Sequence, residues 1–256
     1  MKLVKKSLLA LATAAAMATP AFAALNNVGG VIWEPDAAND FTLSISRVTQ
    51  FVNSSTGVVS GYGYFSNLNN TAVGAFCPGC ELTFTFGGYT PVSQTSNFGT
   101  IVNYFSGGSI NFWVDSTPDT VAGTSNTAAN YGDGTLWLQM AGHSVFSQTF
   151  SGTISFLSNT LQGNGLTDIT GGLAAPAFVN NSQAFGSDLV FTTTFSTIPG
   201  FSGLNGNLAN DAPILSNING AGTATADTLH VPEPGSLALL GLGLVGLAAA
   251  RRRKAA

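Results

Sequence analysis

The sequence predicts an all-β protein: a single β-sandwich or jelly-roll-like domain, flanked by an N-terminal signal peptide and a short C-terminal transmembrane helix. Three observations lead to this fold class. Apolar and polar residues alternate with a period of two in several short runs, and clusters of Gly, Asn and Ser separate these runs. Hydrophobic residues make up 45% of the 256 residues and charged residues only 8%, which favours a packed exported domain over a disordered chain.

Residues 1–23 have the three parts of a secretory signal peptide. Three lysines form its positive beginning: Lys2, Lys5 and Lys6. The apolar segment 8–18 follows and is too short to span a bilayer comfortably. Ala21 and Ala23 fit the small-x-small rule for signal peptidase, so we expect cleavage after Ala23 and a mature chain that begins at Ala24. An uncleaved N-terminal anchor is the alternative.

The predicted β-domain covers residues 24–202. Five runs place alternate apolar residues on one face of a strand: FTLSIS (41–46), LTFTF (82–86), INFWV (110–114), LWLQM (136–140) and LVFTTTF (189–195). In the last run Thr193 interrupts the apolar row. No segment between residues 24 and 230 combines a 3.6-residue period with helix caps, so we expect short strands joined by turns.

The charge of this part of the chain excludes one class of partner. Between residues 24 and 230 one cation, Arg47, stands against eleven acidic residues, so the formal net charge is −10. Such a surface repels phosphate backbones. We therefore expect no nucleic-acid partner.

Cys77 and Cys80 form a C-x-x-C motif. Pro78 and Gly79 suit the central positions of a type II turn, whose outer Cα atoms lie within about 7 Å, and disulfides span Cα distances of roughly 4.4–6.8 Å. We expect a structural disulfide that staples a hairpin tip in an oxidising compartment. Thioredoxin-like chemistry would need the first Cys at a helix N-terminus, and a zinc site would need about four ligands; both alternatives remain open.

The body contains no motif typical of an enzyme, a metal site or a cofactor site, so we expect a non-catalytic protein. His143 precedes Ser144, but neighbours on a strand point to opposite faces. A hydrolase would require a cleft that joins His143 to a carboxylate and a nucleophile. Asp115 and Asp119 are too few for calcium, which binds about six to eight oxygens, so we expect a solvated turn there.

The tryptophans offer a binding alternative. A sugar-stacking platform would use Trp33, Trp113 and Trp137, with Trp113 and Trp137 as the candidate sugar contacts, although such aromatic residues are more often core in a sandwich. If Trp113 or Trp137 faces solvent beside Asn or Asp, a carbohydrate-binding module is favoured. If all three are buried, it is disfavoured.

Residues 203–230 lose the aromatic residues and gain Gly, Asn and Ala, which is typical of a weakly ordered spacer. Residues 222–230 are also compatible with a last edge strand. The chain then ends in a segment of three parts, residues 231–256, that starts with Pro232, Glu233 and Pro234. The two prolines favour an extended stalk.

A short apolar helix is expected at 236–250, because its residues carry no charge and its glycines are common in membrane helices. Four cations follow it: Arg251, Arg252, Arg253 and Lys254. They can extend the span by snorkelling, and they place the C-terminus in the cytoplasm by the positive-inside rule. A permanent membrane anchor is the plain alternative.

These three parts resemble the PEP-CTERM sorting signal of Gram-negative bacteria, over about residues 231–256 only. The resemblance implies recognition of Pro232, Glu233 and Pro234 by an exosortase, a membrane protease that removes the helix and tail. It further implies export across the inner membrane, transient anchoring there, and a final place at the cell surface or outside the cell, often with exopolysaccharide and biofilm. The expected function is a surface or matrix protein; an extracellular hydrolase is the least favoured alternative.

Overall fold

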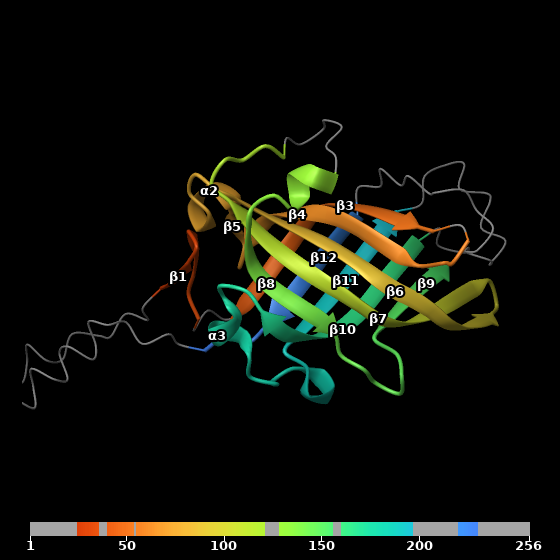
Figure 1. Cartoon of the computed structure of the whole chain (residues 1–256). Helices are drawn as coiled ribbons and strands as arrows, with labels where there is room; N and C mark the ends of the chain where they lie inside the picture. The colour runs from red at the N-terminus through yellow and green to blue at the C-terminus, as the bar shows by residue number, and fades with distance from the viewer. Residues whose placement is uncertain are drawn as a thin grey trace, which may run out of the picture.

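The computed structural model describes residues 25–35, 40–53, 55–120, 128–155, 160–196 and 220–229. The all-β prediction is confirmed, but the sandwich is wrong. The main sheet closes into an antiparallel barrel of eight strands (Figure 1). These strands are β3 (Phe41–Val52), β4 (Val59–Leu68), β6 (Glu81–Asn97), β7 (Thr100–Asp115), β8 (Thr135–Gly142), β10 (Thr160–Gly171), β11 (Leu189–Ser196) and β12 (Gly220–Ala226).

The barrel follows the order β3–β4–β6–β7–β8–β10–β11–β12 and returns to β3. Three pairings close it. β10 pairs with β11 from Thr160–Ser196 to Thr167–Leu189, and β12 pairs with both β11 and β3. The sandwich prediction failed because period two marks one buried face per strand, and a sheet closed on itself satisfies that pattern as well as two stacked sheets do.

One gap in the barrel wall is filled by two strands placed end to end. β8 occupies one end of the gap between β7 and β10, and β9 (Phe150–Ser155) occupies the other end. β9 pairs with β7 at 100–105 and with β10 at 160–165. The loop 143–149 therefore leaves the wall midway along the barrel.

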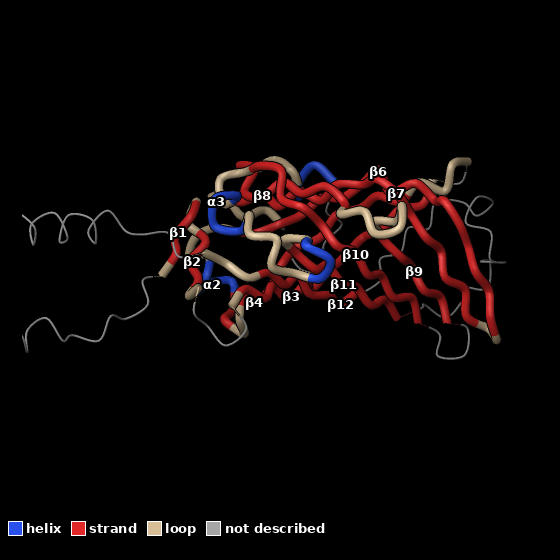
Figure 2. The backbone as a smooth tube through the Cα atoms, turned by 90° about the horizontal axis from the view of Figure 1, so that it is seen from below, coloured by secondary structure: helices blue, strands red, loops and turns tan. Residues whose placement is uncertain are grey.

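The remaining elements are short. β1 (Asn26–Val28) and β2 (Val31–Trp33) form a separate hairpin, and β5 (Thr71–Ala72) pairs with β4. Among the described residues, the helices are α2 (Val73–Phe76) and α3 (Ala175–Phe178), and the 3₁₀ turns are η1 (Ala128–Tyr131) and η2 (Ala184–Gly186). The β1–β2 hairpin, α2 and α3 gather at one end of the barrel, here named the closed end (Figure 2). The opposite end, which includes the β6–β7 turn, is named the rim.

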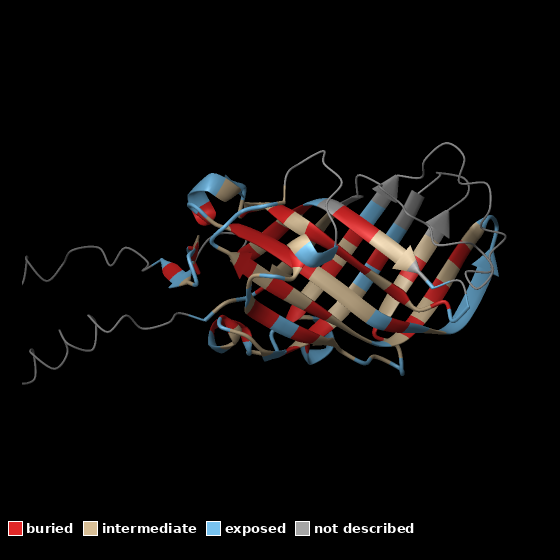
Figure 3. Cartoon of the chain, turned by 45° about the horizontal axis from the view of Figure 1, so that its top comes forward, coloured by how far each residue is buried: buried red, intermediate tan, exposed pale blue. Residues whose placement is uncertain are grey.

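Alternate residues of the strands fill the barrel interior, as the pattern of buried residues along the ribbons shows (Figure 3). At the closed end four aromatic rings pack with centroids 4.7–6.1 Å apart: Trp33, Phe41, Trp137 and Phe178. Each ring is at most 4% exposed. Rings of this size bury much apolar surface, so this cluster seals the closed end.

Glycines make room for rings further along the wall. A Cβ on Gly163 would lie 2.5 Å from the Phe150 ring, and a Cβ on Gly61 would collide with the Phe86 ring and with the carbonyl oxygen of Thr49. These strand glycines accommodate aromatic rings that pack directly on the backbone.

The end of the body corrects the predicted spacer at 203–230. Residues 220–226 form β12, which lies between β11 and β3 and is a central strand, whereas the sequence suggested at most an edge strand. Its threonines and alanines alternate, and Ala224 and Ala226 are buried. The barrel therefore includes the chain almost up to the sorting segment; residues 203–219 lie outside the described residues.

Candidate functional site

The chain leaves the barrel at the closed end, where several hydrogen bonds hold residues 227–229; we name this segment the exit segment. The Leu229 N–H donates to the carbonyl oxygen of Ala177 in α3 at 2.7 Å. The side-chain amide of Asn26 donates to the Leu229 carbonyl oxygen at 3.3 Å. The side-chain amide of Asn180 donates to the Asp227 carbonyl oxygen at 2.7 Å. The last described residues are thus fixed to both β1 and the α3 region.

Thr228 is the most strongly held residue of the exit segment. Its N–H and its hydroxyl donate to the two carboxylate oxygens of Asp40, each at 2.7 Å. Its hydroxyl oxygen accepts a hydrogen bond from the Trp33 indole at 3.2 Å. Hydrogen bonds to a charged carboxylate are stronger than those between neutral groups, so this contact makes the exit segment part of the folded body.

The predicted processing residues lie beyond this point. Pro232, Glu233 and Pro234, the helix at 236–250, the basic tail 251–254 and the signal-peptidase positions Ala21, Ala23 and Ala24 are outside the described residues. Leu229 is only three residues before Pro232. Within the described residues, no helix has the length and hydropathy of a membrane span.

The two cysteines lie as the turn chemistry predicts. Their sulfur atoms are at disulfide distance, and their Cα atoms are 5.1 Å apart. The N–H of Cys80 donates to the carbonyl oxygen of Cys77, and Gly79 has a φ of 78°, which a type II turn requires at its third position. The motif does not sit at a hairpin tip, however. It joins the end of α2 to the start of β6 at the closed end, with Cys77 as the helix C-cap. A Cys at a helix C-terminus lacks the dipole that activates redox thiols.

A groove on the outer wall surrounds the loop between β8 and β9. It has a volume of about 270 Å³, near the small end of ligand sites. The lining includes Tyr104 from β7, Asn164 from β10, and His143, Phe146 and Gln148 from the loop. Sequence reasoning missed this groove, because its residues come from four separate segments and share no motif.

His143 is anchored in this groove. Its backbone N–H donates to the Leu166 carbonyl oxygen at 2.7 Å, and the Nδ1 atom of its ring lies 2.7 Å from Oδ1 of Asp168. His143 is thus paired with a carboxylate, as a hydrolase would need, but Asp168 is not among the residues that line the groove. Among the described residues, no serine, threonine or cysteine side chain is hydrogen-bonded to His143. The observed contacts hold the loop against β10.

Phe146 projects from the tip of the same loop and is 90% exposed. Phe146 and Ser147 both have positive φ, 51° and 66°, between the paired residues Val145 and Gln148. Two positive φ values in succession are the pattern of a type I′ turn, which favours Asn-Gly. A phenylalanine in this conformation is uncommon, and such strained residues occur preferentially at functional positions.

The candidate sugar-stacking residues have different positions. Trp137 is fully buried, with its indole donating to the Val28 carbonyl oxygen at 2.8 Å, so it cannot contact a sugar and that prediction is wrong. A register shift opposite Phe112 and Trp113 breaks the alternation of β8, which explains how Trp137 joins the core. Trp113 is half-buried on the outer wall and donates to the Thr85 hydroxyl at 3.0 Å; its role as a sugar contact stays a prediction.

The acidic residues near the closed end accept hydrogen bonds from the loop that follows β7. The buried carboxylate of Glu81 accepts hydrogen bonds from the N–H groups of Asp119 and Thr120, at 3.3 and 3.1 Å. The Asp119 carboxylate accepts a hydrogen bond from the Asn130 side-chain amide, and the Asp115 carboxylate accepts one from the backbone N–H of Thr117. In the part of the chain that the structure describes, no group of three or more His, Cys, Asp or Glu side chains could hold a metal ion.

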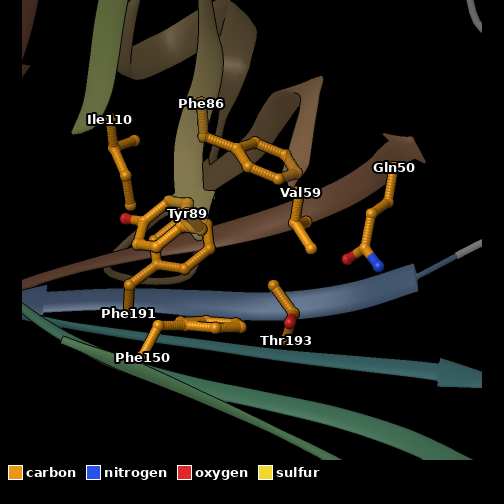
Figure 4. A pocket seen from close by; sticks show the side chains of 8 residues that line it. All are labelled: Gln50, Val59, Phe86, Tyr89, Ile110, Phe150, Phe191 and Thr193. Atoms are coloured by element: carbon orange, nitrogen blue, oxygen red, sulfur yellow. The ribbon is translucent and has the colours of Figure 1, made fainter. Parts of the chain in front are cut away.

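The barrel interior contains a small cavity (Figure 4). Eight residues line it: Gln50, Val59, Phe86, Tyr89, Ile110, Phe150, Phe191 and Thr193. Its volume of about 20 Å³ is room for roughly one water molecule. Burial raises the pKa of the Tyr89 hydroxyl well above its usual range, because the phenolate would be poorly solvated there.

Comparisons with known proteins bear on the C-terminal segment. Residues 230–254 match the family model described as the PEP-CTERM protein-sorting motif. The search of curated proteins and the search of solved structures gave no match. The motif implies export, processing by an exosortase and C-terminal sorting to the cell surface. The chain is therefore an exported β-barrel protein that carries a PEP-CTERM sorting motif at its C-terminus.

Proposed function

We propose that this protein is a non-catalytic surface or extracellular-matrix component, whose barrel is delivered by cleavage near Pro232–Pro234 and then associates with exopolysaccharide or biofilm. The observation that carries the proposal is the position of the motif, three residues beyond a folded and hydrogen-bonded exit segment. Cleavage there would release the whole barrel intact. The filled interior supports a structural body over a carrier, because its cavity holds about one water molecule.

The C-terminus of protein recovered from outside the cell tests this delivery. Intact-mass measurement should show a body that has lost Arg251–Lys254, and the variant P232A/E233A/P234A should stay in the membrane fraction with its tail intact. E34A, which removes an exposed acid directly after the β1–β2 hairpin, is the control and should be processed as wild type. Released protein that keeps its arginines would contradict the proposal.

Carbohydrate binding is the second candidate function, and the groove around Phe146 favours it. Tyr104 and the exposed Phe146 supply aromatic surfaces, and His143, Gln148 and Asn164 supply hydrogen-bonding groups. Aromatic faces with neighbouring polar groups suit sugars, which present apolar faces and hydroxyls. The negative body disfavours acidic polysaccharides, so neutral glycans are the expected ligands.

Binding to an immobilised neutral glycan can be compared between wild type and two variants. F146S should weaken binding about tenfold, since loss of a stacking contact costs on the order of 1–2 kcal/mol. F98S removes another Phe that is 92% exposed, at the rim and away from the groove, and should bind as wild type. Equal binding by all three proteins would contradict a role for the groove.

A further inference from the structure

We propose that the closed end of the barrel docks on the lipid surface while the sorting tail is in the membrane, so that the rim points away from the bilayer. This inference rests on the proposed function, because it requires the tail at 236–250 to be membrane-inserted before cleavage. It concerns a surface of the barrel rather than the sorting motif itself.

The chain leaves the fold at the closed end. Asn26 and Leu229 are hydrogen-bonded to each other at the closed end, and Thr228 is held by Asp40. The tether to the membrane therefore starts at this end of the barrel. It cannot lengthen by unravelling the exit segment without breaking these bonds and the pairing of β12 with two neighbours.

The tether between the barrel and the apolar run is short. From Leu229 to Leu237, where the apolar run begins, there are eight residues, which extend at most about 29 Å. The 17 residues of β6 run from the closed end to the rim and span about 55 Å at roughly 3.3 Å per residue. The closed end must therefore stay near the bilayer, and the rim reaches it only if the whole barrel lies on its side.

The surface around the exit segment is partly apolar. Four apolar side chains at the closed end are 46–56% exposed, and we name them the closed-end patch: Leu25, Leu173, Val179 and Leu229. Leu229 is hydrogen-bonded to α3, Val179 is the C-cap of α3, and the Leu173 side chain lies against Gly29 of the β1–β2 turn. Burying this patch in the interfacial region of the bilayer removes apolar surface from water and favours the upright barrel.

The charged residues near the closed-end patch indicate which lipid headgroup charge favours docking. Exposed Glu34 and Asp227 lie at the same end, and no described lysine is present to attract anionic headgroups. Anionic lipids would therefore weaken docking, because their negative headgroups repel these two carboxylates. The repulsion is strongest at low salt concentration. Zwitterionic phosphatidylcholine is the bilayer on which docking should be strongest.

The experiment uses the mature chain with its tail intact, in phosphatidylcholine nanodiscs that contain a lipid with a nitroxide on its headgroup. A fluorophore is attached through N27C, on exposed β1, or through S96C, on exposed β6 near the rim. We expect the nitroxide to quench the label at position 27 about twofold or more, and to leave the label at 96 unquenched because it is tens of ångströms away.

Substitutions in the patch refine the test. L173S/V179S should lower the quenching at position 27, whereas F98S, an exposed apolar residue at the rim, should leave it unchanged. Co-elution of the protein with nanodiscs reports tail insertion separately. Failure to co-elute would overturn the anchoring and this inference together; co-elution with equal quenching at both labels would overturn the docking alone.

Discussion

Replacing Thr228 by Val removes the hydroxyl that joins the exit segment to the barrel, at nearly constant shape. The variant loses the 2.7 Å hydrogen bond to the Asp40 carboxylate and leaves the Trp33 indole without the acceptor it has at 3.2 Å. A hydrogen bond to a charged group contributes about 1.5–3 kcal/mol, and an unsatisfied buried donor costs about 1–3 kcal/mol. We therefore expect the free energy of unfolding to fall by about 3 kcal/mol.

Urea unfolding followed by far-UV circular dichroism measures this change without depending on Trp33 fluorescence. With an m-value of about 3 kcal/mol/M, the midpoint should fall by about 1 M. T225V is the matched control: Thr225 lies half-exposed on β12, three residues before Thr228, and its loss should change stability by less than about 0.5 kcal/mol. Equal midpoints for T228V and T225V would refute the reasoning that the exit segment is part of the folded body.

Three further predictions follow from the interior and the turn. G163A should destabilise by about 1–3 kcal/mol, since its methyl meets Phe150, whereas G152A on the paired strand meets its nearest atom at 3.6 Å and should be tolerated in urea unfolding. Reducing Cys77–Cys80 should lower the free energy of unfolding by about 2 kcal/mol, the chain-entropy value for so short a loop. The raised pKa of Tyr89 means that unfolding releases a proton above about pH 10, so stability should fall by about 1.4 kcal/mol per pH unit there, and Y89F should remove that slope.

The strands that alternate large apolar residues with Thr or Ser were predictable from the sequence. Phe41, Leu43 and Ile45 of β3 are all buried, as are Leu82 and Phe84 of β6. Burial on one face imposes period two wherever the strand stays regular. Local pattern was therefore sufficient for these elements and for the class of the fold.

Three strands and the closure of the sheet were not predictable in the same way. β4, β10 and β12 contain glycines at 61, 163 and 222, and glycine within a strand weakens the alternating pattern by which strands are predicted. Their role depends on rings and backbone from other strands that pack against them, and a single sequence does not reveal such long-range contacts. The pairing of β10 with β11 that closes the barrel is likewise a tertiary feature.

The candidate sites were likewise predictable only where their residues are continuous in sequence. The sorting motif and the cysteine turn are continuous in sequence, so short-range chemistry identified them. The groove brings together Tyr104, His143 and Asn164 from distant parts of the sequence. The exit segment is held by the contact between Thr228 and Asp40, which are 188 residues apart. A single Phe146 among polar loop residues was the one local signal that could have pointed to the groove.

The place of β12 in the barrel also fixes an order of events during synthesis. Of the strands that the structure describes, β12 is the last to emerge, yet it must insert between β11 and a β3 strand made about 180 residues earlier, with Thr225 opposite Thr42. Pairings over such separations form late, because a long loop must close first. A nascent chain that stops before residue 220 is left as an unclosed sheet with two bare edges, which invite aggregation. The barrel closes only when the chain has been made almost up to the sorting motif. A nascent chain that stops before residue 220 therefore lacks both the closed barrel and the motif.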